Sequence, residues 1–279
     1  MPELPEMQAL AERLDDAFRG SAVDEFELLG FAGLKTVLPS PDELLGSRIT
    51  GVGRRGKYLV ISLDGGARIL VHLSQAGRLD LETPAKRTRP KGSIVRIHFD
   101  NGSALLVREH GTQRKAGWWV LGPGDDGPLA VLGPEPDDPA FAEAIMTGDS
   151  NRHIHTVLRD QRTLAGVGRG YTDDVLNLVG ISPFAPLRSL TSDQRSRLVA
   201  AVRSVLEAAL DQERERTGGL SDPKLGLRFA VHNRVGQPCP RCGEPLLRVS
   251  FESHEIVYCK HCQTKGRALA DRRLSRLLR

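Results

Sequence analysis

The sequence predicts an α+β, multi-domain protein with an N-terminal helix and β-sandwich, then a helical domain, then a C-terminal ribbon that contains cysteines. Three observations predict this order. Apolar residues recur at helical spacing near the N-terminus, short strand patterns with hairpin turns follow, and all four cysteines lie between positions 239 and 262. A chain of 279 residues is long enough to bury a substantial core in one or two domains.

Composition excludes several classes of protein. A hydrophobic content of 39% and a charged content of 27% are typical of a water-soluble globular protein. No run of 18 apolar residues is present, so we expect no membrane-spanning helix. The N-terminus lacks a basic start followed by an apolar segment, so we expect no secretory signal and a cytoplasmic location.

Charge is unevenly distributed along the chain. The net charge is only +4, but residues 232–279 contain ten Lys/Arg against four Asp/Glu. Residues 122–149 contain seven acidic residues and no Lys or Arg. A basic C-terminal segment after an acidic one indicates a localised face for binding a polyanion.

The first six residues, Met1 to Glu6, carry the groups for covalent chemistry. If Met1 is removed, Pro2 has a free secondary amine, and amines that form Schiff bases are covalent catalysts. An α-amino group titrates at about pH 7.7–8.0 and a lysine at roughly 10.4, so the terminal amine is more often unprotonated at neutral pH. Glu3 and Glu6 add carboxylates suited to general acid–base catalysis. Alone, these residues are more typical of a solvated chain end, so the hypothesis depends on the rest of the chain.

A helix is predicted directly after the terminal residues. Met7, Leu10, Leu14 and Phe18 recur at spacings of three and four, and Gly20 marks a stop. Such a helix would fix the terminus in place, as a nucleophile requires.

Short strands are predicted from Arg48 to about Trp119, which favours a sandwich or barrel-like domain. The predicted strands are Tyr58–Leu63, Arg68–Leu73, Ile94–Phe99, Ala104–Arg108 and Trp118–Leu121. The segment Arg54-Arg55-Gly56-Lys57-Tyr58 brings three cations to the first strand, either as a solvated basic turn or as a binding element.

The middle of the chain is predicted to contain a linker followed by helices. Residues 122–149 are rich in Gly, Pro and Asp, and helical patterns follow at His155–Gln161, up to about Val179, and at Gln194–Gln212. The turn Gly166-Val167-Gly168 lies between two helices, so a dinucleotide fingerprint does not fit. It is either an ordinary turn or a site where backbone N–H groups meet a phosphate.

The cysteines form the strongest local signal. Cys239-x-x-Cys242, sixteen residues, then Cys259-x-x-Cys262 match a zinc ribbon with four thiolates and one structural Zn²⁺. A redox pair is the alternative, but two knuckles without a thioredoxin-like pattern disfavour it. We expect His261 to be a bystander. After the ribbon, residues 264–279 suggest a basic amphipathic helix that contacts nucleic acid or packs on the ribbon.

In this order the motifs resemble the formamidopyrimidine-DNA glycosylase and endonuclease VIII family of base-excision repair enzymes. The resemblance covers Met1 to Gln263 and is carried by Pro2 to Glu6, Arg54 to Leu59, His72-Leu73, Leu132 to Pro136, Gly166 to Tyr171 and the knuckles ending in Cys262-Gln263. It implies an N-terminal catalytic β-sandwich domain at 1–121, a linker at 122–150, a helix–two-turns–helix DNA-binding domain at 151–231, a zinc ribbon at 232–264 and a basic tail at 265–279.

The resemblance also implies roles for individual residues. Pro2 attacks C1′ of a damaged nucleotide, Glu3 moves protons at the sugar, Glu6 holds the terminus and Lys57 contacts a phosphate at the lesion. DNA contacts are implied for His72, Gln75, Arg114, Gly168, Arg169, Tyr171 and His254. Several positions differ from the family pattern: its wedge methionine is replaced by Gln75, and the arginine–phenylalanine pair that fills the emptied base stack aligns to Arg114-Lys115. Arg169 stands in place of the asparagine after the glycine turn, Asp174 in place of a glutamate in the second helix, and His254-Glu255-Ile256 in place of the Arg-Gly/Ala-Thr turn of the zinc finger.

The resemblance therefore implies a DNA glycosylase with AP-lyase activity. It would remove a damaged base through a Schiff base on Pro2 and nick the strand by elimination. The expected partner is double-stranded DNA with a damaged base or AP site, bound by a monomer at the nucleoid. One alternative keeps this chemistry with a preference for oxidised pyrimidines or AP sites. Another is a damaged-DNA or AP-site binding paralogue with reduced or absent base excision, and a third, a plain zinc-ribbon binding protein, leaves Pro2 to Glu6 unexplained.

Overall fold

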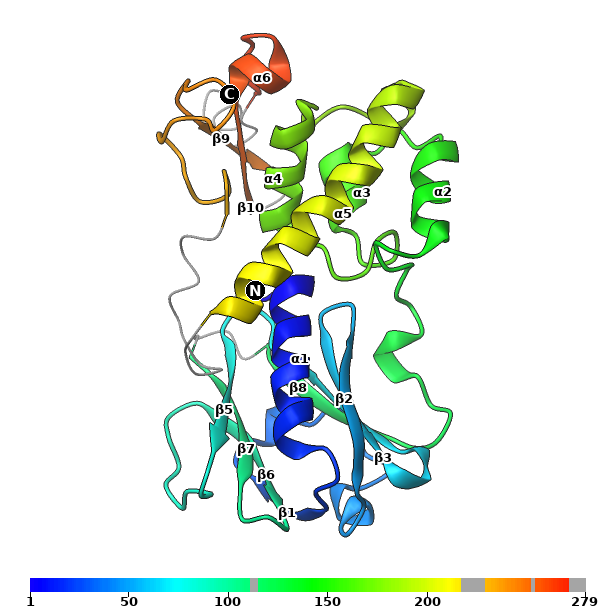
Figure 1. The fold of residues 1–279 in the computed structure, drawn as a ribbon, viewed down its shortest axis with the longest axis vertical. Coiled ribbons are helices and arrows are strands. Elements are labelled where there is room, and N and C mark those ends of the chain that lie inside the picture. The colour runs from blue at the N-terminus through cyan, green and yellow to red at the C-terminus, as the bar shows by residue number, and fades with distance from the viewer. Residues whose placement is uncertain (111–114, 217–228, 252–253, 271–279) are drawn as a thin grey trace, which may run out of the picture. The chain divides into compact units, whose positions relative to one another are not determined.

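The computed structural model describes residues 1–110, 115–216, 229–251 and 254–270 (Figure 1). The chain divides into two compact units. Unit 1 is Met1–Val131 with Leu210–Pro223, and unit 2 is Leu132–Ala209 with Lys224–Arg279. No helix in the described part of the chain is long and apolar enough to cross a membrane.

Unit 1 contains two four-stranded antiparallel sheets, with strand orders β2-β3-β4-β8 and β1-β6-β7-β5. The strands are β1 (Val23–Leu28), β2 (Ile49–Arg55), β3 (Tyr58–Leu63), β4 (Arg68–His72), β5 (Gly77–Glu82), β6 (Ser93–Phe99), β7 (Ala104–Glu109) and β8 (Gly117–Leu121). The predicted sandwich is confirmed, and the five predicted strands correspond to β3, β4, β6, β7 and β8. Strands β1, β2 and β5 were not predicted, because their polar residues and glycines weaken the strand pattern.

Helix α1 (Leu4–Phe18) packs into the core that the two sheets share. Leu14 and Phe18 are completely or almost completely buried, at 0% and 1% exposure, and the Phe18 ring lies 4.2 Å from that of Phe99. The apolar face read from the sequence therefore fixes the helix on the sandwich, as predicted.

A charged side chain is fully buried in the second sheet of unit 1. Arg96 on β6 has 0% side-chain exposure, and its Nε donates to Glu82 Oε2 on β5 at 2.9 Å. Arg96 also pairs with Glu27 on β1. Burial alone would lower the pKa of Arg96, but these two carboxylates raise it, so the guanidinium stays charged.

Replacing Arg96 with leucine is expected to lower the free energy of unfolding of unit 1 by about 3–5 kcal/mol, because Glu82 is left buried without its partner. Both tryptophans, Trp118 and Trp119, lie in β8, so tryptophan fluorescence in urea reports on this unit. Arg48→Leu is the control: its pair with Asp100 is 3.7 Å long and exposed, and its loss should cost at most about 1 kcal/mol. Equal effects of the two substitutions would contradict this account.

Unit 2 contains four helices and a two-stranded ribbon that is followed by a short fifth helix, within the described residues. The elements are α2 (Pro139–Thr147), α3 (Ile154–Arg159), α4 (Arg169–Val179), α5 (Ser192–Glu215), β9 (Leu247–Phe251), β10 (His254–Tyr258) and α6 (Lys260–Thr264). The predicted helices correspond to α3, α4 and α5, and β9 and β10 pair as an antiparallel hairpin within the predicted zinc ribbon.

Helix α2 lies inside the segment that the sequence suggested was a linker. Asp138 caps it by accepting the Ala140 N–H at 2.9 Å, Pro139 is its first residue, and Phe141 and Ile145 are fully buried. Only one apolar pair at helical spacing is buried in these nine residues, which is too little to outweigh the surrounding Gly and Pro in the sequence pattern.

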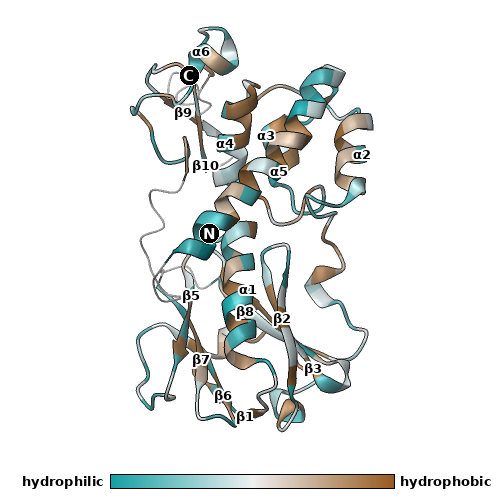
Figure 2. Ribbon diagram, in the orientation of Figure 1, coloured by the Kyte–Doolittle hydropathy of each residue, from teal (hydrophilic) through white to brown (hydrophobic). Residues whose placement is uncertain are grey.

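The C-terminal end of α5, from Leu210 onwards, belongs to unit 1. Figure 2 shows this end as hydrophilic, whereas the helix is more apolar earlier in its length. Arg13 of α1 donates to the carbonyl oxygens of Glu213 and Arg216, and Arg214 pairs with Glu12 at 2.7 Å. These contacts join the end of α5 to the polar side of α1.

The predicted basic C-terminal helix is not seen at residues 265–270, which contain no helix. Leu269 N–H donates instead to the Tyr258 hydroxyl at 2.8 Å, so this stretch packs on the ribbon. The remaining residues, 271–279, lie outside the described part of the chain.

Candidate active site and zinc centre

The N-terminal end of α1 is held by a capping box. Glu3 N–H donates to Glu6 Oε2 at 2.6 Å, and the Glu6 N–H donates in return to the Glu3 side chain. Both carboxylates are buried, at 4% and 7% exposure, and Pro5 stiffens the first turn. Pro2 precedes this cap directly and is itself buried. Pro2, the candidate nucleophile, is therefore attached directly to a rigid helix end.

The tip of the β2–β3 hairpin lies near the same end of α1 (Figure 1). Arg54 Nε, close to the tip, donates to Gln8 Oε1 on α1 at 3.0 Å. Gly56 adopts φ +57° and turns the chain into Lys57, which is only 8% exposed. The sequence thus brings a buried lysine to the region of the capped terminus.

His72 lies beside this hairpin. It ends β4 opposite Tyr58, and the two ring centroids are 4.7 Å apart. Burial, and then the charge of nearby Lys57, lower the pKa of His72 to about 4. The imidazole is therefore neutral at pH 7, and any phosphate contact it makes is that of a neutral donor.

Gln75 is exposed at the tip of the tight turn between β4 and β5. Ser74 adopts φ +52°, and Gly77 N–H donates to the Leu73 carbonyl at 2.8 Å. A Cβ on Gly77 would lie 2.3 Å from that carbonyl oxygen, so the turn requires glycine there. The backbone thus presents Gln75 to solvent.

The loop between β7 and β8 starts next to this turn, since His110 N–H donates to the Ala76 carbonyl at 3.0 Å. Buried Glu109 holds the other end by accepting the N–H groups of Lys115 and Ala116 at 3.0 and 3.2 Å. Arg114 lies outside the described residues. Glu109 was not predicted, because a single acid at a strand end is no sequence signal.

In unit 2, a side chain organises the glycine turn before α4. Gln161 Nε2 donates to the Val167 carbonyl at 2.6 Å, and its Oε1 accepts the Gly166 N–H at 3.0 Å. Gly166 adopts φ +93°, which favours glycine. Gly168 is the N-cap of α4, so its turn aims backbone N–H groups outward from a helix N-terminus.

The two residues after this cap differ in their surroundings. Arg169, the first residue of α4, is half-buried. Tyr171 is buried at 2% exposure, with its ring edge-on to Phe229 at 5.0 Å. The tyrosine ring is therefore part of the packing that supports the helix N-terminus.

The motif at residues 132–136 packs against the same turn. Gly133 N–H donates to the Gln161 carbonyl at 2.8 Å, and Ala165 N–H donates to the Pro134 carbonyl at 2.9 Å. A Cβ on Gly133 would lie 2.2 Å from the Arg162 carbonyl oxygen. These contacts support the backbone of the glycine turn before α4, which is the candidate phosphate-binding site.

Two adjacent buried carboxylates connect α4 to the ribbon. Asp173 accepts His155 Nε2 at 3.2 Å, His232 Nδ1 at 2.6 Å and the Val257 N–H at 3.2 Å. Asp174 accepts three backbone N–H groups from residues 230–232, yet burial raises its pKa to about 6. No sequence pattern marks this network, because its partners are distant in the chain.

His254, predicted to contact DNA, begins β10 and is half-buried. Its ring stacks near that of His155, with centroids 6.0 Å apart. The neighbouring Glu255 pairs with Arg248 across the hairpin at 2.8 Å, which offsets the negative charge on this part of the ribbon.

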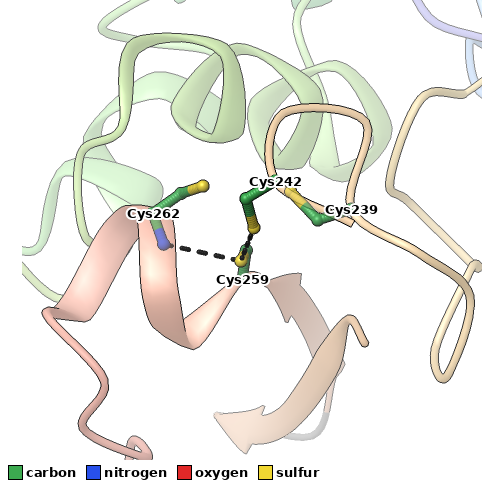
Figure 3. Close-up of side chains that lie close together, drawn as sticks. All are labelled: Cys239, Cys242, Cys259 and Cys262. Carbon is green, nitrogen blue, oxygen red and sulfur yellow. Dashed lines mark hydrogen bonds between the residues drawn. The ribbon is translucent and has the colours of Figure 1, made fainter. Parts of the chain in front are cut away.

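The four cysteines converge from two segments, as Figure 3 shows. Their sulfurs all lie within 4.8 Å of one another, and Cys242 Sγ is 3.5 Å from Cys259 Sγ. Tetrahedral zinc with Zn–S bonds of about 2.3 Å requires sulfurs roughly 3.8 Å apart, so the thiolates fit Zn²⁺. His261 is exposed and outside this group, as expected. The four cysteines form a closed structural zinc site.

Helix α4 contacts the zinc site directly. Asn177 Nδ2 lies 3.7 Å from Cys239 Sγ and 3.2 Å from Gln263 Oε1. Gln263 Oε1 in turn accepts the Cys259 N–H at 2.8 Å. One end of α4 thus carries the glycine turn, and the other end supports the metal ligands.

Comparisons with known proteins agree with this arrangement. Residues 1–119 match the formamidopyrimidine-DNA glycosylase N-terminal domain, residues 132–219 its H2TH domain, and residues 236–265 the zinc finger found in FPG and IleRS. The formamidopyrimidine-DNA glycosylase of Chloroflexus aurantiacus is 33% identical, covering 94% of this chain and 98% of the relative. That of Thermus thermophilus is 34% identical, covering 95% of this chain and 100% of the relative.

Solved structures give the same result. The crystal structure of the MutM (Fpg) protein from Thermus thermophilus has a TM-score of 0.80 and 30% identity, covering 94% of this chain and 98% of the other. The Lactococcus lactis Fpg in complex with DNA containing an abasic site has a TM-score of 0.83 and 25% identity, covering 94% of this chain and 99% of the other. With these matches to all three parts of the fold, the chain belongs to the formamidopyrimidine-DNA glycosylase family.

Proposed function

We propose that the protein is a base-excision-repair DNA glycosylase and AP lyase that uses the nitrogen of Pro2 as its nucleophile. Family membership supports the glycosylase and lyase activities. The observation that carries the assignment to Pro2 is the buried capping box, which attaches this residue to the rigid start of α1 beside two buried carboxylates. A nucleophile must be held in a near-attack position, and a capped helix end supplies this.

The chemistry requires that Met1 is removed, because an amide nitrogen does not attack carbon. The freed amine of Pro2 then forms a bond to C1′ as the bond from C1′ to the damaged base breaks; the departing base takes up a proton, and the nitrogen of Pro2 gives up its own. The sugar ring opens with a proton taken up by its oxygen, which leaves an iminium between Pro2 and C1′. Glu3 is the candidate for moving protons at the sugar, and Glu6 for holding the terminus.

Strand cleavage then starts from the same iminium. The iminium makes the C2′ hydrogen acidic, so a base can remove that proton and the bond from C3′ to its phosphate oxygen breaks by elimination. Water then hydrolyses the iminium and releases Pro2. Every step uses groups of the N-terminal end, and the zinc site has only a structural role.

DNA contacts are proposed for both units. Lys57 and neutral His72 would bind phosphate near the lesion, and Gly168, Arg169 and His254 would bind phosphate from unit 2. Tyr171 would support this contact through its packing on Phe229. A damaged nucleotide leaves the stack at a cost of a few kcal/mol, and Gln75, at the tip of an exposed turn, would occupy part of the vacated space. For Arg114, a DNA contact is proposed from the sequence alone. We expect a monomer that acts on nucleoid DNA in the cytoplasm.

A second candidate function is binding of damaged DNA with reduced or absent base excision. The observation that favours it is the exposed polar side chain of Gln75 at the turn tip, where an apolar wedge would stack better against bases.

Borohydride reduction is expected to trap a covalent complex between the correctly processed protein and AP-site DNA, because it reduces the iminium to a stable amine. The complex is detected as a band of lower mobility in a denaturing gel, and peptide mass spectrometry should place the DNA on Pro2. A processed protein that binds DNA but forms no adduct would favour the binding function. An adduct on a lysine would move the nucleophile elsewhere.

A further inference from the structure

The amide side chain of Asn177 is buried where the last turn of α4 meets the cysteines. Its exposure is 2%, and its Nδ2 lies 3.7 Å from Cys239 Sγ and 3.2 Å from Gln263 Oε1. Neither the cysteine pattern nor the proposed chemistry at Pro2 uses this residue. A buried primary amide has two N–H groups, and leaving either without an acceptor costs free energy.

The hydrogen bonds of Gln263 fix the orientation of the Asn177 amide. Gln263 Oε1 accepts the Cys259 N–H at 2.8 Å, and Gln263 Nε2 donates to the Ile181 carbonyl at 2.9 Å. The oxygen of Gln263 therefore faces Asn177, which must present its NH₂ group in return. One N–H of this group donates to Gln263 Oε1, and the second is left to donate to Cys239 Sγ.

The sulfur of Cys239 is a pure acceptor in the zinc-bound protein. A cysteine that ligates metal is a thiolate and has no proton to donate. The contact of 3.9 Å between Cys239 Sγ and Asn177 Oδ1 is therefore not a hydrogen bond in that state, whereas the contact with Nδ2 is. Four thiolates and one Zn²⁺ carry a net charge of −2, which an N–H donor partly offsets.

The C-terminal end of α4 would disfavour an anionic site without such donors, because the last carbonyls of a helix carry partial negative charge. Arg241, inside the first knuckle, donates through Nη1 to the Asn177 carbonyl at 3.0 Å. Gly180 caps the helix with φ +70°, and a Cβ there would lie 2.8 Å from Arg241 Nη1 and 3.3 Å from the Cys262 carbonyl oxygen. Both knuckles thus pack on this helix end, and Arg241 and Asn177 supply donors between it and the thiolates.

We propose that Asn177 is part of the zinc site and helps to retain the metal by donating a hydrogen bond from Nδ2 to the Cys239 thiolate. The bond forms in a buried environment, where it is stronger than in water. Residues that hydrogen-bond to metal ligands typically change metal affinity by about 10–100-fold when they are replaced. The inference concerns the metal site alone and does not depend on Pro2 as the nucleophile.

The test compares Asn177→Leu with Val175→Ala in the full-length protein. Asn177→Leu removes the donor and keeps most of the side-chain volume. Val175 is buried two residues earlier in α4, so Val175→Ala loosens the packing of the same helix without removing a side-chain donor. Competition with a chelator of known affinity measures zinc binding. Asn177→Leu should bind zinc about 10–100-fold more weakly than the wild type, and Val175→Ala should bind it as the wild type does.

Cobalt in place of zinc reports on the hydrogen bond itself. The charge-transfer band of Co²⁺ bound to thiolates depends on the energy of the sulfur lone pairs, which an N–H donor lowers. The band of Asn177→Leu should therefore move to longer wavelength, and that of Val175→Ala should stay in place. Unchanged zinc affinity in Asn177→Leu, equal losses in the two variants, or a loss without a band shift would overturn the proposal.

Asn177→Gln decides the question if Asn177→Leu holds no cobalt. Glutamine keeps the amide, so cobalt binding with the wild-type band would support a donated hydrogen bond. No binding, or a shifted band, would assign Asn177 to packing alone and overturn the proposal.

Discussion

A protein whose N-terminus is blocked ahead of Pro2 is expected to lose strand cleavage while it keeps its affinity for DNA. The block turns the amine into an amide, whose nitrogen cannot form an iminium. Removal of a covalent nucleophile in other enzymes costs on the order of 10⁶-fold in rate, so cleavage should fall below detection. The measurement compares single-turnover cleavage of AP-site DNA by the processed protein and by a form with a short N-terminal extension.

Two controls make this result specific. Binding to a tetrahydrofuran analogue should be equal for the two forms, which shows that the extension has not blocked the DNA surface. A processed Pro2→Gly variant retains a terminal amine and should retain measurable cleavage. Persistent cleavage by the extended protein would assign the nucleophile to a lysine, and buried Lys57 would be the first candidate.

Replacing Cys239 with serine is expected to release zinc and to weaken DNA binding by at least about tenfold. Zinc binding supplies an apparent free energy of roughly 10–16 kcal/mol to small zinc modules, so a ribbon with three thiolates should not keep its fold. The Val257 N–H of the ribbon donates to the Asp173 carboxylate of α4, so loss of the ribbon would also remove a hydrogen bond that holds α4. Zinc is measured with a chromogenic chelator, and affinity by titration with labelled DNA.

His261→Ala is the matched control for the zinc prediction. His261 lies directly before Cys262 but is exposed and outside the cysteine group, so this variant should retain both zinc and affinity. A Cys239→Ser protein that lost zinc but bound DNA normally would show that the ribbon is not part of the binding face.

Much of this fold could be predicted because its signals are local. The periodic apolar face of α1, the hairpin turns of the sandwich and the paired cysteine knuckles each occupy a short stretch of sequence. Helix α2 was missed because a cap and two apolar residues within nine positions do not dominate their Gly- and Pro-rich surroundings. Strand β2 was missed because two of its seven residues are glycines.

The supporting residues of the site could not be predicted, because their partners lie far away in the chain or depend on the folded backbone. Gln161 organises the glycine turn, Glu109 holds the loop after β7, and Asp173 meets a histidine that follows it by 59 residues. Each is a single polar residue in an ordinary sequence context. What identifies them is burial together with a set of hydrogen-bond partners, and the fold alone creates that combination.

Helix α4 is an eleven-residue rod about 16 Å long, with the glycine turn at one end and Asn177 against the zinc thiolates near the other. Cysteine thiolates are readily oxidised, and an oxidised cysteine no longer ligates metal. Severe oxidative stress would therefore release the ribbon and loosen the support of this rod. An enzyme of this build would be disabled by the same oxidants that damage the genome it repairs.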